Sequence, residues 1–231
     1  MFAALNVYHD GAAHSAAMNL AIDEVLLEYA TVPSIRFYRW HSPALSFGYF
    51  GRFAHVACYA GDRDLVRRWT GGGIVFHGDD LTYSIVIPAN DKAFSESSMS
   101  IYEKVHCALR DTLEGNGKRA VVAGGSDPGG AADAIRIAFS AGGYNCFANP
   151  VRADVMVDGR KIAGAAQRRT RRGLLQQGSI QGIDLANGLS ERFAVELSTN
   201  CEPRSLPKAI HCRAREIAAR KYATDAWLRK R

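Results

Sequence analysis

Residues 153–164, ADVMVDGRKIAG, contain the feature that most constrains how this chain folds. Two short runs of β-branched and apolar residues flank Asp158-Gly159, and Asp-Gly is a pair favoured in the two-residue type I′ turn of a β-hairpin. The pattern therefore predicts two adjacent antiparallel strands joined by this turn. The register places Lys161 directly after the turn, on a strand that continues through Ile, Ala and Gly.

Hydrophobic periodicity predicts the other elements. Apolar residues recur at helical spacing in 18–30, where Asp23 is expected to face away from the apolar side, and in 98–117 and the tail 209–231. Strands are expected at 34–40, 44–50, 64–69, 74–77, 82–88 and 173–182. Residues 123–143, rich in Gly and Ala, are typical of an irregular connection. Since no regular βαβ rhythm is present, we expect an α+β fold, with a mixed β-sheet packed with helices.

Composition excludes several classes of protein. The chain has 231 residues, 47% of them hydrophobic and 23% charged, as in an ordinary soluble globular protein with one core. No apolar run is long enough to span a membrane, and the N-terminus does not resemble a signal peptide. The five cysteines form no CxxC pair, which indicates reduced thiols in the cytoplasm. The net charge of +6 favours an acidic partner, either a nucleic acid or a protein.

The segment RRWTGGGIVFH, residues 67–77, is a candidate binding loop. Consecutive glycines allow a tight turn and close approach to a ligand, and their N–H groups can form an anion-binding nest. Arg68 adds positive charge just before Gly71, Gly72 and Gly73. A glycine-rich hairpin turn with a structural His77 is the alternative interpretation.

Lys161 is a candidate catalytic residue. Small neighbours, Gly164 and Ala165 among them, leave room for a ligand beside the strand, and a desolvated ammonium there needs an anion or a polarised carbonyl. A solvent-facing hairpin lysine is the alternative. The following QRRTRRG, residues 167–173, is expected to be a solvated basic loop; nucleic-acid binding is disfavoured because no aromatic residues interleave with its arginines.

Five segments, in order, resemble the lipoate–protein ligase and octanoyltransferase family, which shares its catalytic fold, related to class II synthetases, with biotin–protein ligases. They are MNLAIDEVLLE, PSIRFYRWHSPALSFGYF, RRWTGGGIVFH, DGRKIAGAAQRR and LLQQGSI. The resemblance covers nearly the whole chain and is nearest to the cysteine-dependent octanoyltransferase branch. It implies a single biotin/lipoyl protein ligase catalytic domain over residues 1–231, without a separate C-terminal accessory domain.

The resemblance also implies roles for individual residues. Lys161 would hydrogen-bond the acyl carbonyl, with Gly71, Gly72, Gly73 and His77 lining the site. Arg68, Gly164 and Ala165 are included as substrate-binding residues. Trp40 and Tyr83 are candidates for the acyl-tail channel, and a core role for either is equally open.

The resemblance leaves two reactions open for this fold, and they differ in whether Cys146 is the nucleophile. The Cys146-Phe147 pair stands where the transferase branch has the cysteine that carries octanoate from acyl carrier protein as a thioester, a reaction without cofactor. The Lys161 ammonium would lower the pKa of such a thiol. The alternative is an ATP- and Mg-dependent lipoate–protein ligase acting through lipoyl-AMP. Gly73 completes a triple glycine typical of ligases, and Asn149-Pro150-Val151 departs from the segment that follows Cys-Phe in the transferases.

Both chemistries imply the same acceptors, lipoyl-domain proteins such as the glycine cleavage H protein or the E2 of 2-oxoacid dehydrogenases. Neither requires nucleic acid or a membrane. A biotin–protein ligase is disfavoured because RRWTGGG replaces its usual Gly-Arg-Gly-Arg loop. A passive lipoyl-domain scaffold would leave Lys161 and the glycine loop unused.

Overall fold

A computed structural model describes residues 1–124, 150–185 and 188–230, and every structural statement below concerns these residues. The strands are β1 (Leu5–His14), β2 (Ser34–Trp40), β3 (Ala44–Phe47), β4 (Asp64–Arg67), β5 (Ile74–His77), β6 (Leu81–Pro88), β7 (Ala120–Val122), β8 (Val155–Val157), β9 (Arg160–Thr170), β10 (Gly173–Ile180) and β11 (Cys201–Arg204). The α-helices are α1 (Ala16–Tyr29), α2 (Ser98–Gly115), α4 (Leu189–Leu197), α5 (Lys208–Ile217) and α6 (Asp225–Leu228). Short helical turns are η1 (Phe53–His55), η2 (Ala57–Tyr59), η3 (Lys92–Ser95) and η4 (Ala218–Tyr222).

The strands form two sheets. The large sheet has eight strands in the order β11-β1-β2-β6-β10-β9-β8-β7, and β4-β3-β5 form a smaller one. The pairs β11/β1, β1/β2 and β3/β4 are parallel and the others are antiparallel. The expected α+β fold with a mixed sheet is therefore confirmed.

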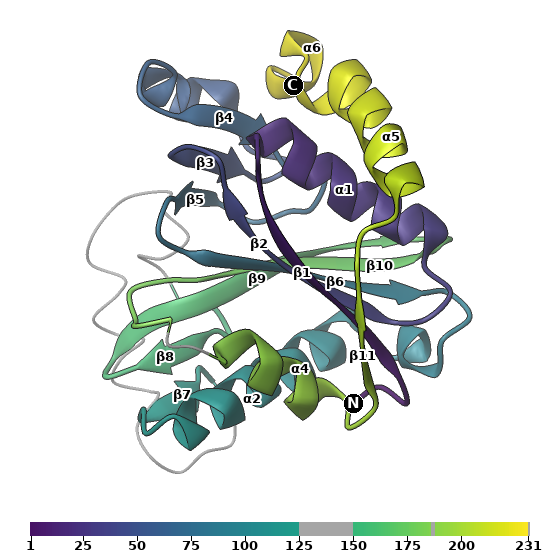
Figure 1. The fold of residues 1–231 in the computed structure, drawn as a ribbon. Coiled ribbons are helices and arrows are strands. Elements are labelled where there is room, and N and C mark those ends of the chain that lie inside the picture. Colours follow the sequence, from purple (N-terminus) through teal and green to yellow (C-terminus); the bar gives the residue numbers. More distant parts are fainter. Residues whose placement is uncertain (125–149, 186–187, 231) are drawn as a thin grey trace.

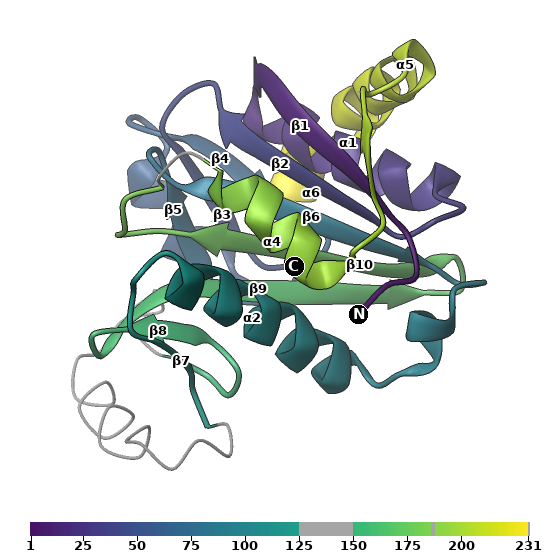
Figure 2. The ribbon, with the colours of Figure 1, turned by 60° about the horizontal axis from the view of Figure 1, so that its bottom comes forward.

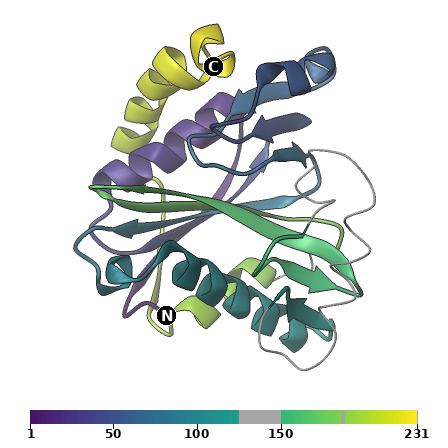
Figure 3. The same ribbon diagram turned by 180° about the vertical axis from the view of Figure 1, so that it is seen from behind.

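Helices cover both faces of the large sheet. Helices α2 and α4 pack on one face, whereas α1, α5 and the small sheet lie on the other (Figures 1 and 2). Each face has its own apolar core. The two chain ends lie on opposite sides of this sheet (Figure 3).

The predicted hairpin is present. Asp158 and Gly159 join β8 to β9 with φ angles of 48° and 74°, as a type I′ turn requires at both central positions. β9 runs on to Thr170, so the segment predicted to be a basic loop is largely strand. Because side chains alternate along a strand, Arg168 packs over the Tyr49 and Trp69 rings and Arg169 over Phe94.

One prediction for the first helix is wrong. Asp23 of α1 is completely buried instead of facing away from the apolar side. The reason is Arg36 of β2, also completely buried, whose Nη1 donates to Asp23 Oδ1 at 2.8 Å. Tyr38 and Gln177 also donate to this carboxylate, so the buried charge is paired and hydrogen-bonded.

The C-terminal segment is held against β4. Ile217 and Tyr222 are buried as expected, and Trp227 is half-buried. Arg67, the first arginine of RRWTGGG, donates to the carbonyl oxygens of Trp227, Leu228 and Lys230. This arginine therefore joins the chain end to the strand that leads into the glycine loop. No helix within the described ranges is long and apolar enough to cross a membrane.

Candidate functional site

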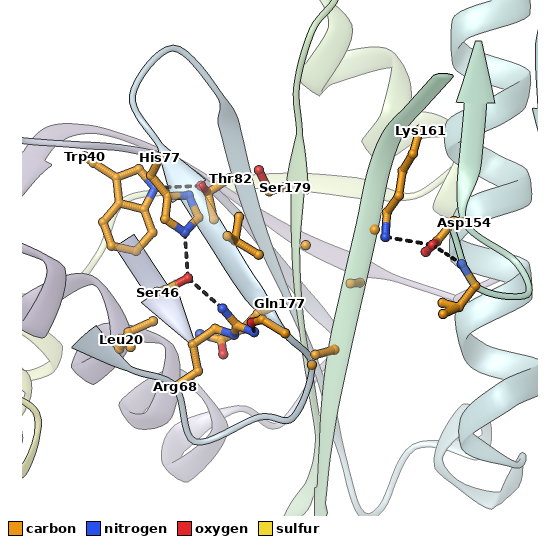
Figure 4. A pocket seen from close by; sticks show the side chains of 18 of the residues that line it. Leu20, Trp40, Ser46, Arg68, His77, Thr82, Asp154, Lys161, Gln177 and Ser179 are labelled. Atoms are coloured by element: carbon orange, nitrogen blue, oxygen red, sulfur yellow. Dashed lines mark hydrogen bonds and ion pairs between the residues drawn. The ribbon is translucent and has the colours of Figure 1, made fainter. Parts of the chain in front are cut away.

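A cavity of about 230 Å³ lies between β9 and β10 of the large sheet and the small sheet with its glycine loop (Figure 4). Small residues of β9 and β10 form one wall, with Lys161 beside it, and Trp40, Ser46 and His77 lie on the opposite side. The described lining residues are Leu20, Tyr38, Trp40, Ser46, Arg68, Gly72, Gly73, Val75, His77, Thr82, Val151, Asp154, Lys161, Gly164, Ala165, Ala166, Gln177, Gly178 and Ser179.

Lys161 reaches this cavity from β9 and is not solvent-facing. Its side chain is only 4% exposed, and Nζ lies 2.7 Å from Asp154 Oδ2, whose side chain is fully buried. Asp154 Oδ1 accepts a hydrogen bond from Tyr102 OH at 2.7 Å. Such a pairing is what a buried ammonium needs, and it fixes the direction in which Lys161 presents its charge.

Gly164 and Ala165 continue the wall next to this ammonium. A Cβ at Gly164 would lie 2.6 Å from Lys161 Cε and 2.8 Å from its Nζ, so the lysine occupies the space that a side chain would take. The backbone N–H of Ala165 donates to Tyr102 Oη at 3.0 Å. Tyr102 thus ties the carboxylate partner of Lys161 to the strand that lines the cavity.

Arg68 organises the glycine loop. Its Nη2 donates to the carbonyl oxygens of Gly71 and Gly73 at 3.0 and 2.8 Å, and its Nη1 donates to Ser46 Oγ at 2.7 Å. Gly72 has a φ of 84°, a left-handed conformation that favours glycine. The loop therefore turns these carbonyl oxygens toward a buried guanidinium.

His77 belongs to a buried polar chain beside Trp40. The two rings stack with centroids 4.0 Å apart. His77 Nδ1 lies 2.8 Å from Asp80 Oδ2 and Nε2 lies 2.7 Å from Ser46 Oγ. Because an ionised carboxylate only accepts, Nδ1 carries the proton and, in the neutral ring, Nε2 accepts from the Ser46 hydroxyl.

Two pKa shifts accompany this chain. Burial lowers the pKa of His77, although the Asp80 carboxylate opposes the effect. Burial would raise the pKa of Asp80, but hydrogen bonds from His77, Ser179 and Thr82 outweigh it and hold this pKa below its usual value. His77 is therefore a neutral imidazole hydrogen-bonded to the ionised carboxylate of Asp80.

The structure brings most of the predicted site residues to one cavity. Lys161, Arg68, Gly72, Gly73, His77, Gly164 and Ala165 line it, as does Trp40. Gly71 is not among the lining residues, but its carbonyl oxygen accepts a hydrogen bond from Arg68, which does line the cavity. Tyr83 lies in the core, where its hydroxyl is 3.0 Å from His106 Nε2. Cys146 lies outside the described residues, as does most of segment 123–143.

Sequence reasoning did not identify Asp154, Ser46, Asp80 or Tyr102. Asp154 carries a weak signal, because an aspartate directly before a buried strand is unusual without a partner. Tyr102 belongs to α2, a helix whose apolar face alone explains its presence in the sequence. Ser46 contacts His77 through the pairing of β3 with β5, and Asp80 contacts His77 from three residues further along the chain, but neither residue belongs to a motif that indicates this role.

Comparison with known proteins identifies the family of the chain that forms this cavity. Residues 15–185 match the model of the lipoyl protein ligase A/B catalytic domain, a range that includes every site residue described above. The chain belongs to this family.

Relatives and solved structures agree with that assignment. The chain is 38% identical over 174 residues to octanoyltransferase LipM of Oceanobacillus iheyensis, covering 71% of this chain and 59% of the relative. It is 36% identical over 176 residues to octanoyltransferase LipM of Macrococcus caseolyticus, covering 72% and 62%. The matched part thus spans only about three fifths of the length of these relatives.

The fold matches the bipartite lipoate protein ligase of Thermoplasma acidophilum, whose structural study also includes its E2 lipoyl domain. The TM-score is 0.71 at 19% identity, covering 98% of this chain and 96% of that chain. The biotin/lipoyl protein ligase catalytic fold, expected from the resemblance, is therefore confirmed. Where the structure describes the chain, it contains no group of three or more His, Cys, Asp or Glu residues that could hold a metal ion.

Proposed function

We propose that this protein is an acyltransferase that attaches an octanoyl or lipoyl group to a lysine of lipoyl-domain proteins, with octanoyl-acyl carrier protein as the donor. The observation that carries the proposal is Lys161, held by Asp154 at 2.7 Å beside a cavity that small and apolar residues line in part. A medium-length acyl chain suits such a cavity, because burying each CH₂ is worth about 0.8 kcal/mol.

The ammonium of Lys161 supplies the electrostatic part of the chemistry. When a nucleophile adds to a thioester carbonyl, negative charge develops on the carbonyl oxygen, and a preorganised cation stabilises that charge most in a water-poor site. Asp154 and Tyr102 keep the cation in place. The glycine loop and the hydrogen-bonded side chains of His77 and Ser46 form the opposite side of the cavity.

Cys146 is the proposed nucleophile. Its thiolate adds to the octanoyl thioester, the carrier thiolate leaves, and an octanoyl-Cys146 thioester results. The neutral amine of the acceptor lysine then attacks this thioester, an amide forms, and the Cys146 thiol is released with the amine proton. One thioester replaces another in the first step, so no cofactor is required. Support for Cys146 comes from its place in the sequence and from the relatives named octanoyltransferase LipM.

The proposal includes the partners and the location. The acceptor is a lipoyl domain of the glycine cleavage H protein or of a 2-oxoacid dehydrogenase E2, and the structural neighbour studied together with an E2 lipoyl domain supports this class. The location is the cytoplasm, on the sequence argument from reduced thiols. Residues 1–231 form one catalytic domain in this proposal.

A donor comparison tests the proposed function. The purified protein and an apo lipoyl domain are incubated either with octanoyl-acyl carrier protein without ATP, or with free lipoate, ATP and Mg²⁺. Octanoylation in the first mixture alone supports the transferase. Modification in the second mixture alone would make the protein a lipoate–protein ligase acting through lipoyl-AMP.

A further inference from the structure

A second groove adjoins the acyl cavity. It measures about 450 Å³, and Gly72 and Gly73 line both spaces, so the glycine loop is the partition between them. The described residues that line the groove are Phe47, Gly48, Phe50, Gly51, Arg52, His55, Val56, Gly72, Gly73 and Ile74. The groove therefore leads from the segment that follows β3 to the edge of the acyl cavity.

The groove has an apolar floor and an exposed aromatic rim. Phe47 and Val56 are buried beneath it, with Ile74 packed against them. Phe50, at the rim, is 84% exposed, the largest exposed fraction among the large hydrophobic residues of the described chain. An exposed aromatic beside an arginine is the composition of a protein-binding hot spot.

The charge around the groove is positive. Of its described lining residues, Arg52 and His55 are basic and none is acidic. Arg52 is exposed and makes no ion pair with any acidic side chain that the structure describes. An adjoining hollow shares Phe50 and Arg52 and adds Arg229 and Lys230, which extends the basic rim.

The positive charge of the groove favours the acyl donor over the acceptor lysine of the lipoyl domain. A protonated acceptor lysine arriving through the groove would meet the Arg52 guanidinium, and like charges disfavour that approach. A donor with an acidic surface and a phosphate-linked arm meets complementary charge, which also steers its association. The arm can lie over the apolar floor and bring its thioester to Gly72 and Gly73.

From these observations we propose that the groove between Phe50–Arg52 and the glycine loop is the docking site of the acyl donor, an acidic carrier protein that holds its acyl group as a thioester on a long phosphate-linked arm. Phe50 is the apolar anchor, and Arg52 binds the phosphate or an acidic side chain of the carrier. The inference rests on the proposed function, because it assigns a surface to the donor of that reaction.

Phe50→Ala and Arg52→Glu test the docking site, with Arg119→Glu as the matched control. Arg119 is 95% exposed and directly precedes β7, an edge strand of the large sheet, whereas the groove is lined by residues of the small sheet and the segments beside it (Figure 1). Octanoyl transfer is measured with purified octanoyl-carrier and lipoyl domain, varying each in turn. We expect each groove variant to raise KM for the carrier about tenfold. Its kcat and its KM for the lipoyl domain should stay as in the wild type, and Arg119→Glu should change neither KM.

Octanoyl-pantetheine, which lacks both the carrier and the phosphate, provides the second measurement. The wild type and Arg52→Glu should use it equally well, because the acyl cavity is intact in both. A raised KM for the lipoyl domain, an equal loss with octanoyl-pantetheine, or no effect on the carrier would each overturn the docking site. A wild type that transfers nothing from the carrier but uses lipoate and ATP would instead refute the proposed function.

Discussion

Lys161 and Asp154 form a buried pair whose two members have separable roles. Each side chain is at most 4% exposed, so removing one partner leaves the other as an uncompensated buried charge. In the proposed reaction only the lysine meets the substrate, whereas Asp154 holds it in position. Stability and activity should therefore respond differently when the pair is dismantled one residue at a time.

Lys161→Met should lower the free energy of unfolding by about 3–5 kcal/mol, because the Asp154 carboxylate is left buried and unpaired. Adding Asp154→Asn removes that charge, so the double variant should regain much of the lost stability and none of the octanoyl transfer. Urea unfolding and a transfer assay on both variants measure the two effects. Recovery of activity in the double variant would show that the Lys161 ammonium is dispensable.

Gly164→Ala should displace the Lys161 side chain with little effect on the fold. The new Cβ would meet Lys161 Cε at 2.6 Å, and the far end of a flexible side chain can move away. Because a misplacement of about 1 Å costs roughly 100-fold in rate, we expect kcat to fall by about that factor with a near-normal melting temperature. Gly78→Ala, whose Cβ meets nothing within 4 Å, is the control. Equal kcat values for the two variants would contradict this account of Lys161.

At the scale of elements, the glycine loop depends on a glycine outside it. A Cβ at Gly48 would lie 2.0 Å from the Gly72 carbonyl oxygen and 2.6 Å from Gly71 C, both backbone atoms. The segment after β3 and the loop are therefore in direct backbone contact. Gly71, by contrast, has open space around its Cβ position.

Gly48→Ala should displace the loop and destabilise the protein by roughly 1–3 kcal/mol, the usual cost of overpacking, with loss of acyl transfer. Gly71→Ala should keep stability within about 0.5 kcal/mol of the wild type. Thermal unfolding of the two variants side by side is the measurement. A destabilised Gly71→Ala protein with a normal Gly48→Ala protein would show that the loop does not depend on the close backbone contact at Gly48.

Local signals predicted some elements and missed others for a physical reason. The β8–β9 hairpin and α2 carry their own turn or capping residues, Asp158-Gly159 and Asn116-Gly117, so they could be predicted. Strand β1 contains glycine and alanine, and it is stabilised by parallel pairing with β2 and with β11, which lies almost 200 residues further along the chain. Such non-local pairing leaves no pattern in a short window of sequence.

The residues of the candidate site likewise fall into two groups, those that a sequence motif predicted and those that only the tertiary structure brings together. Lys161 and the glycine loop lie in contiguous motifs, and the sequence predicted that they belong together. Asp154, just before β8, is brought to the lysine by the β8–β9 hairpin, whereas Tyr102 reaches Asp154 through the packing of α2 on the sheet. Ser46 meets His77 only because β3 pairs with β5. These partners satisfy buried charges, a requirement that exists only once the tertiary structure has formed.

At the scale of the whole molecule, buried histidines make stability depend on pH. His106 of α2 is completely buried, lies 3.0 Å from Tyr83 OH through Nε2, and contacts the Ala153 carbonyl through Nδ1. Burial lowers the pKa of His106 to about 4. Between this value and the ordinary histidine pKa of about 6.5, the unfolded chain binds a proton that the folded protein does not.

The free energy of unfolding should therefore fall as the pH decreases from about 6.5 to about 4, with about 3 kcal/mol of the loss arising from His106. His106→Asn should be less stable at neutral pH, because its shorter side chain cannot reach Tyr83, yet show a shallower slope in that interval. Urea unfolding of both proteins at several pH values gives the slopes. Identical slopes would mean that His106 takes up its proton equally in the folded and unfolded states.

In the proposed reaction, the acyl group passes through this protein as a thioester on Cys146, whose carbonyl Lys161 polarises. Intact-protein mass spectrometry after mixing with octanoyl-acyl carrier protein, without ATP, tests it most directly, with Cys146→Ala as the control. We expect one octanoyl adduct on the wild type, absent from the variant and transferred to an added apo lipoyl domain. No adduct on the wild type, or an equal adduct on Cys146→Ala, would contradict it.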